Sequence, residues 1–251
     1  MKARLIGGWG MIAAMALVGA ASGCGGVGEE LEPSDVASTE QLVGGEDKAD
    51  GLYGAATYTY YSARHDNRRC AWPMCGGWWV RRVNLSTTKC ANGSYQAECY
   101  VERLDLARLG TVATSFDATT GLLRGNIVSN VINGQEWGKF VATEGWRASS
   151  GIKPIAGTFR RLQDNGTRCI TFPCNTTHAA RLNQAYHSNI SGVDLSSTGA
   201  NRREIDAAMA LASAPGGAGI LAVGTLRTVP NAGPAGAGLT FGATQFYTPA
   251  R

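Results

Sequence analysis

The chain has 251 residues, of which 44% are hydrophobic and 17% are charged, and its formal net charge is +4. About 200 residues are enough for one domain with a sizeable core. Because the arginines are spread along the chain rather than gathered in one long run, composition and charge argue against a nucleic-acid-binding protein.

Residues 1–23 have the pattern of a cleaved secretory signal peptide. Lys2 and Arg4 precede an uncharged, mostly apolar stretch from Leu5 to Gly23 that ends in small residues. A membrane-spanning helix is the alternative, but it needs about 20 strongly apolar residues, and glycines dilute this stretch. We therefore predict a signal peptide that takes no part in the fold.

The residues that end this stretch, ASGC at 21–24, resemble the lipobox of bacterial lipoproteins, with Ala21 in place of the usual leucine. The resemblance implies that Cys24 becomes the acylated N-terminus of the mature protein, carrying palmitate or similar chains. Several acyl chains anchor a protein firmly in a membrane, whereas one chain holds it only marginally. Since Gly25 rather than aspartate follows the cysteine, the resemblance implies the outer membrane, on its periplasmic or surface face.

Residues 24–51 are predicted to form a disordered tether, because they contain eight acids, one base and no aromatic side chain. Without the tether and the two bases of the signal peptide, the chain keeps 20 bases and 11 acids, a net charge of +9. Such a body is suited to anionic partners, such as acidic polysaccharide or lipopolysaccharide. The alternative is a solvated basic surface with no dedicated partner.

The body has the chemistry of a β-rich fold, with Val, Thr, Tyr and Trp between closely spaced glycines. Its first half is expected to contain strands at 56–64, 78–84, 100–106 and 138–146, and a helix of poor propensity near 115–123. Its second half is expected to contain strands at 155–162, 178–183, 190–195, 220–227 and 239–247. A capping box of Asn201 and Glu204 predicts a helix before the last two strands. The final strand is expected to pair with 56–64.

The two halves look like copies of one unit. At an offset of 99, Cys70 aligns with Cys169, Cys75 with Cys174, and Asn84 with Asn183. The segment LDLARLG at 104–110 resembles VDLSSTG at 193–199, where the offset has fallen to 89, and the missing ten residues correspond to CANGSYQAEC at 90–99. We predict repeats at 52–150 and 151–251, packed as one mainly β domain (β-rich α+β), barrel- or sandwich-like, with one or two short helices.

Six cysteines follow Cys24, and an exported chain lies in an oxidising compartment where cysteines pair. Six cysteines allow 15 pairings. The repeat favours Cys70–Cys75 and Cys169–Cys174, which leaves Cys90–Cys99. A four-cysteine zinc site is the rival, and the oxidising location argues against it. No metal or cofactor is expected.

The runs RHDNRRCAWPMCGGWWVRRVN, CANGSYQAECYVERLD and DNGTRCITFPC resemble a domain family of unknown function, found mostly in secreted and lipid-anchored myxobacterial proteins. The resemblance covers nearly all of 52–250. It implies lineage and location, and it supplies no activity, substrate or catalytic residue.

Catalytic signatures are scarce. The sequence has no zinc-protease motif, no nucleophile elbow after the signal peptide and no phosphate loop. The only histidines, His65, His178 and His187, are the candidate bases for catalysis near neutral pH, and two of them flank the cysteine loops on opposite sides in the two copies. This asymmetry favours surface or packing roles, so a non-enzymatic protein is favoured over a cryptic hydrolase.

Three tryptophans of the first copy, Trp72, Trp78 and Trp79, are candidates for stacking against a sugar or peptide, although the same rings also suit a core. We interpret the chain as a lipid-anchored cell-envelope protein with a structural or binding role, its ligand an anionic glycan or another envelope component. A peptidase inhibitor that presents the loop 70–75 is a second alternative. The sequence does not define an oligomeric state.

Overall fold

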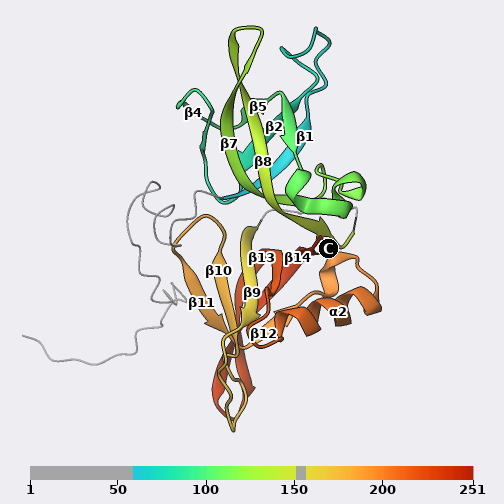
Figure 1. Ribbon diagram of the computed structural model, residues 1–251. Coiled ribbons are helices and arrows are strands. Elements are labelled where there is room, and N and C mark those ends of the chain that lie inside the picture. Colours follow the sequence, from blue (N-terminus) through green and yellow to red (C-terminus); the bar gives the residue numbers. More distant parts are fainter. Residues whose placement is uncertain (1–58, 151–156, 251) are drawn as a thin grey trace, which may run out of the picture. The chain divides into compact units, whose positions relative to one another are not determined.

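The computed structural model describes residues 59–150 and 157–250 (Figure 1). The predicted signal peptide, Cys24, the tether and the boundaries of the two repeats lie outside the described residues. Within them the chain is mainly β, as predicted, with a large antiparallel sheet and short helices. The sheet does not close into a barrel in this part of the chain, and a sandwich-like arrangement fits.

The elements of the first repeat are β1 (Thr59–His65), β2 (Trp78–Arg82), β3 (Thr88–Lys89), β4 (Tyr95–Gln96), β5 (Cys99–Val101), β6 (Arg103–Asp105), η1 (Ala107–Ser115), β7 (Leu122–Ile132) and β8 (Gln135–Ala148). The elements of the second repeat are β9 (Thr158–Asp164), β10 (Thr177–Arg181), β11 (His187–Ile190), β12 (Gly192–Asp194), η2 (Ser196–Thr198), α2 (Arg202–Ala212), β13 (Ile220–Gly233) and β14 (Gly236–Pro249).

The strand order confirms two pseudo-symmetric repeats. It runs β11-β10-β9-β13-β14-β8-β7-β1-β2-β5, so each half lists corresponding strands in mirrored sequence around the β14–β8 junction. At that junction Thr248 pairs with Arg147. Short strands also match, because β6 pairs in parallel with β8 and β12 pairs in parallel with β14.

The expected pairing of 239–247 with 56–64 is wrong. β14 pairs with β13 along a long hairpin and with β8, whereas β1 pairs with β2 and β7. Consecutive strands joined by a short turn pair readily, and this leaves the far side of β14 for its counterpart in the other copy.

Two equivalent asparagines join the repeats, because each makes the same set of hydrogen bonds to the backbone of the other repeat. Asn183 donates from Nδ2 to the carbonyls of Tyr60 and Val83 and accepts from the Tyr60 amide. Asn84 donates to the carbonyls of Phe159 and Leu182 and accepts from the Phe159 amide. Both asparagines have positive φ, 61° at Asn84 and 60° at Asn183, a conformation that asparagine tolerates better than most residues.

Matching glycines place a β-bulge in each long hairpin. The register shifts between Arg124 and Gly125 and between Val223 and Gly224. At Gly224 an added Cβ would lie 2.0 Å from the Gly242 carbonyl oxygen, so no larger residue fits there without a shift of the backbone. The bulge therefore requires glycine.

The core is divided among three clusters. One lies in the first repeat, around Phe140 and Val101, and one in the second, around Phe241 and Leu162. The third combines residues from both repeats, namely Tyr60, Val83, Leu122 and Trp146 with Leu182, Leu221, Val223 and Tyr247. Because this cluster needs both copies, neither repeat completes its core alone.

The helices differ between the copies. The capping box of Asn201 and Glu204 is present at the start of α2, as predicted. The helix expected near 115–123 is absent: 3-10 turns fill Ala107–Ser115, and Asp117 instead accepts bonds from the Thr119 and Thr120 side chains. Side chains that bond their own backbone neighbourhood favour turns over helix. No helix in the described residues has the length and apolar character needed to cross a membrane.

Candidate binding site

The three candidate tryptophans do not form one surface. Trp72 lies on the first cysteine loop with 58% of its surface exposed. Trp78 packs against the first-repeat core cluster and stacks on His65, with ring centroids 3.7 Å apart. Trp79, its neighbour on β2, lines a pocket. Adjacent residues of a strand point to opposite faces, which accounts for the separation.

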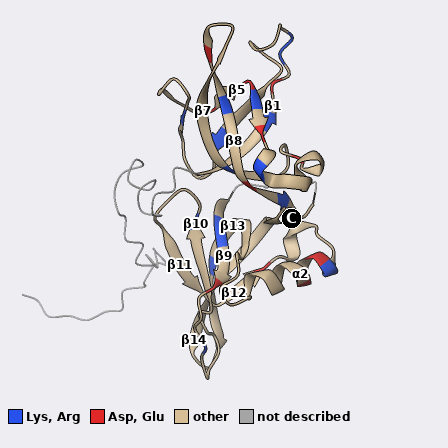
Figure 2. Cartoon of the chain, in the orientation of Figure 1, with Lys and Arg blue, Asp and Glu red and all other residues tan. Residues whose placement is uncertain are grey.

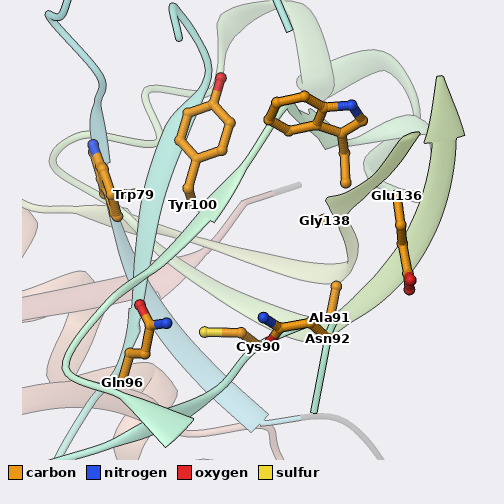
Figure 3. Close-up of a pocket in the computed structure, with 9 residues that line it drawn as sticks. Trp79, Cys90, Ala91, Asn92, Gln96, Tyr100, Glu136 and Gly138 are labelled. Atoms are coloured by element: carbon orange, nitrogen blue, oxygen red, sulfur yellow. The ribbon is translucent and has the colours of Figure 1, made fainter. Parts of the chain in front are cut away.

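The pocket that Trp79 lines has a volume of about 240 Å³ and opens between β2, β5, β8 and the segment that carries the Cys90–Cys99 disulfide (Figure 3). Its lining residues are Trp79, Cys90, Ala91, Asn92, Gln96, Tyr100, Glu136, Trp137 and Gly138. Aromatic rings form part of its wall, and the exposed side chains of Asn92, Gln96 and Glu136 form a polar rim. In Figure 3, Gln96 and Glu136 lie on opposite sides of the opening.

The aromatic rings pack edge to face. Trp79 and Tyr100 have centroids 5.6 Å apart at 65°, and Tyr100 and Trp137 have centroids 6.2 Å apart at 73°. The Tyr100 hydroxyl donates to the Pro73 carbonyl at 2.8 Å and accepts from the Gly77 amide at 3.2 Å. Burial raises the pKa of Tyr100. The ring is therefore fixed between its strand and the first cysteine loop.

Two arginines lie against Trp79, and each is paired with an acid. Arg64 and Arg68 have their guanidinium carbons 5.4 Å and 5.2 Å from the centroid of the Trp79 ring. Arg64 bonds Glu98 at 2.5 Å, and Arg68 bonds Asp66 through its Nε at 2.9 Å. These pairs compensate both positive charges next to the pocket.

Asp66 organises this side of the pocket. Its carboxylate accepts from the Arg68 amide at 3.2 Å and from the Arg68 Nε at 2.9 Å, and Arg68 first, with a smaller contribution from the Trp79 side chain, holds the pKa of Asp66 down at about 2. The carboxylate is thus ionised at every physiological pH and orients the Arg68 side chain, which lies over the Trp79 ring.

The disulfide Cys90–Cys99 closes the segment that only the first copy has. Within it the Cys90 amide donates to the Ser94 carbonyl and the Gly93 amide donates to the Cys90 carbonyl. Asn92 accepts from the Ser94 amide and hydroxyl at 3.0 and 2.7 Å. The bonded turn holds the Asn92 side chain at the pocket rim.

The second copy has a different set of residues at the matching positions. Strand registers match Trp79 with His178, Tyr100 with Asn189, and Trp137 with Gly238. An added Cβ at Gly238 would lie 2.8 Å from the Ser191 hydroxyl and 3.3 Å from Cβ of Pro173. Close packing therefore occupies the space that the first copy gives to Trp137, so the aromatic pocket is not a requirement of the shared fold.

The remaining candidates behave differently. Structure confirms the pairings Cys70–Cys75, Cys90–Cys99 and Cys169–Cys174. The histidines do not gather around one site. His65 belongs to β1, whereas the ring centroids of His178 and His187 lie 4.8 Å apart in the second repeat. Burial lowers the pKa of His178. Among the described residues no group of three or more metal-ligating side chains occurs.

A second polar cluster, which the sequence did not reveal, joins the repeats. Glu144 accepts from Arg124 at 2.5 Å and from the Trp146 indole at 3.1 Å, and Arg161 donates to the Tyr60 hydroxyl. Burial raises the pKa of Tyr60 to about 12. A cavity of about 340 Å³ adjoins Glu144, Trp146 and Arg161. No sequence signal marks this cluster, because its members are far apart along the chain and meet only in the folded sheet.

Basic residues occur on strands of both repeats and at the start of α2 (Figure 2). They do not concentrate at the Trp79 pocket, where Glu136 is the only charged lining residue.

Comparison with protein families matches residues 59–251 to a family model described as a domain of unknown function, DUF6748. No curated protein and no solved structure gives a match.

Proposed function

Since the chain belongs to the DUF6748 family, a domain family of unknown function, we propose its role from its own residues: it is a lipid-anchored binding module of the bacterial cell envelope, and its ligand is a saccharide. The observation that carries this proposal is the Trp79 pocket, which combines fixed aromatic rings with a rim of amide and carboxylate groups. A pyranose has apolar C–H faces that pack on aromatic rings and hydroxyls that bond to such polar groups.

The difference between the repeats supports a functional pocket. Fold requirements act on both copies, yet the three aromatic residues and the segment 90–99 occur in the first copy only. Features that the fold does not need, gathered at one place, are expected where a ligand binds. The other copy then serves as the structural partner that completes the shared core.

The proposed location rests on the N-terminal sequence and the cysteines. The signal peptide at 1–23 and the lipobox cysteine Cys24 predict export and acylation. Three disulfides suit an oxidising compartment. We place the protein on the outer membrane, with the segment 25–51 as a tether between the anchor and the body.

Acylation is tested by labelling bacteria that express the full chain with a palmitate analogue. The wild-type chain should incorporate the label and fractionate with the outer membrane. Cys24→Ala should lose both properties while its body still reacts as a folded, disulfide-bonded protein. Equal labelling of the two chains would refute the anchor and leave the binding proposal intact.

Saccharide binding is tested on a glycan array with the full chain purified in detergent. Trp79→Ala should lose about tenfold or more in affinity, as expected for an aromatic residue at the centre of a binding site. The matched control is Phe172→Ala, which removes a ring that is 56% exposed on the second cysteine loop. Binding that is unchanged by Trp79→Ala would refute the site.

The exposed first cysteine loop favours one alternative, a peptidase inhibitor. Trp72 and Met74 project from this disulfide-closed loop with 58% and 54% of their surfaces exposed. A protease panel measured with Trp72→Ala and Met74→Ala tests it, because inhibition that these substitutions abolish would favour an inhibitor over a saccharide-binding module. We retain no hydrolase proposal, since the three histidines are divided between the repeats.

A further inference from the structure

We propose that the Trp79 pocket selects uncharged saccharides and discriminates against uronates and phosphorylated sugars. This inference rests on the proposed saccharide binding and defines its ligand class. It departs from the expectation, based on the net charge of +9 of the body, that the ligand is an anionic glycan.

The first step is the charge of the lining. Of the nine lining residues, Glu136 alone carries a charge, and it is an exposed carboxylate at the rim. A sugar hydroxyl donates well to a carboxylate. An acidic sugar group at the same place meets a like charge, which weakens binding by about fivefold when two charges lie about 4 Å apart in water.

The second step is the pairing of the nearby cations. Arg64 and Arg68 lie over the Trp79 ring, where they would otherwise attract an acidic ligand. Arg64 is held by Glu98 and Arg68 by Asp66. Glu98 belongs to the segment 90–99, so the insertion that supplies the rim of the pocket also supplies the acid that neutralises Arg64.

The third step is the hydrogen-bonding capacity of the rim. The side-chain amide of Gln96 donates one N–H to the Ser94 hydroxyl at 3.3 Å, so its oxygen and its second N–H can bond a ligand. The Asn92 side-chain oxygen accepts from Ser94, so its amide nitrogen can donate to a ligand. With Glu136 opposite, the rim offers both donors and acceptors, as a set of neutral hydroxyls requires.

The test uses matched pairs of oligosaccharides, each a neutral pyranose chain and its uronate counterpart, titrated into the full chain in detergent at low salt. The neutral member of each bound pair should bind at least fivefold more tightly. Glu136→Gln should lower the ratio of neutral to uronate affinity by about fivefold, because it removes the like charge at the rim. Glu98→Gln, which releases Arg64, should also improve uronate binding.

Asp206→Asn is the matched control, because it makes the same change in net charge on α2, where Asp206 pairs with Arg202. Its ratio of neutral to uronate binding should equal that of the wild type. A narrowed ratio in this control would mean that net charge, and not the pocket, sets the preference.

The outcomes separate the two proposals. Tighter binding of uronates that Trp79→Ala abolishes would overturn the selectivity and preserve the saccharide-binding site. Pocket-dependent binding of a quaternary ammonium compound in place of sugars would overturn both, as would the absence of any saccharide whose binding depends on Trp79.

Discussion

Asn183 and its counterpart Asn84 satisfy backbone groups of the opposite repeat, which is a task that few side chains can perform. Each needs a donor and an acceptor on one short side chain and a backbone that tolerates positive φ. Asparagine meets both conditions. The sequence alignment placed these two residues at equivalent positions, but alignment alone does not predict that each bonds the other copy.

Replacing Asn183 by alanine should destabilise the protein by about 2–4 kcal/mol. The Tyr60 amide and two carbonyls lose their partner, which costs about 1–3 kcal/mol, and alanine at positive φ adds about 1 kcal/mol. Asn183→Gly removes only the bonds and should therefore be less harmful. Urea unfolding with the disulfides intact measures both variants. Two variants within about 0.5 kcal/mol of the wild type, a range typical of neutral surface changes, would contradict the role of Asn183.

Asp66 predicts an acid-sensitive pocket. Arg68 mainly, and Trp79 to a smaller extent, lower the pKa of Asp66 to about 2. The pKa of an aspartate in the unfolded chain is about 3.9. The stabilisation by the carboxylate is therefore complete above about pH 4 and is lost as the pH falls through about 2. The NMR signal of the Trp79 indole N–H should move over this range. Asp66→Asn should show no such titration, and an unchanged wild-type signal from pH 5 to pH 2 would refute the contact.

At the scale of elements, sequence patterns between neighbouring residues predicted local structure correctly, whereas the pairing of strands distant in sequence was predicted wrongly. The capping box of α2 and the cysteine pairs depend on residues close in sequence, and all are present. The pairing predicted for the last strand failed, because β13 and β14 form a hairpin and its outer edge then meets β8. Strand order in a large sheet depends on which copy supplies the neighbour, and composition carries no information on that choice.

The disulfide of the segment 90–99 shapes the pocket rim and also ends in the first-repeat core cluster at Cys99. The double variant Cys90→Ser/Cys99→Ser removes the bond that shapes the pocket rim, so saccharide affinity should fall. The stability cost should be about 2–3 kcal/mol at most, as for other short disulfide loops.

The control for this variant is Cys169→Ser/Cys174→Ser, which opens a loop in the second copy. Its stability cost should be no larger, because Cys169 and Cys174 are less buried than Cys99, and its affinity should equal that of the wild type. Isothermal titration and thermal melts measure both quantities. Equal loss of affinity in the two double variants would argue that the bonds act through general stability.

At the scale of the whole molecule, the sequence revealed the duplication but not the pocket. Trp79 was a candidate because it stands in a conspicuous tryptophan pair, whereas Tyr100 and Trp137 come from β5 and β8 and meet Trp79 only through the strand registers. The same comparison of repeats that exposed the cysteine loops would have marked all three positions, had the registers been known. The shared core, similarly, depends on the mirrored strand order.

This shared core predicts that the two repeats unfold together. Every tryptophan after residue 51 lies in the first copy, so tryptophan fluorescence reports on that copy alone. Leu162→Ala, at a fully buried position of the second-repeat cluster, should cost about 2–5 kcal/mol. Because the third cluster and the asparagine bonds couple the copies, the fluorescence midpoint in urea should shift as far as the circular dichroism midpoint. A fluorescence transition that stays at its wild-type midpoint, while the circular dichroism signal splits, would show that the repeats are independent.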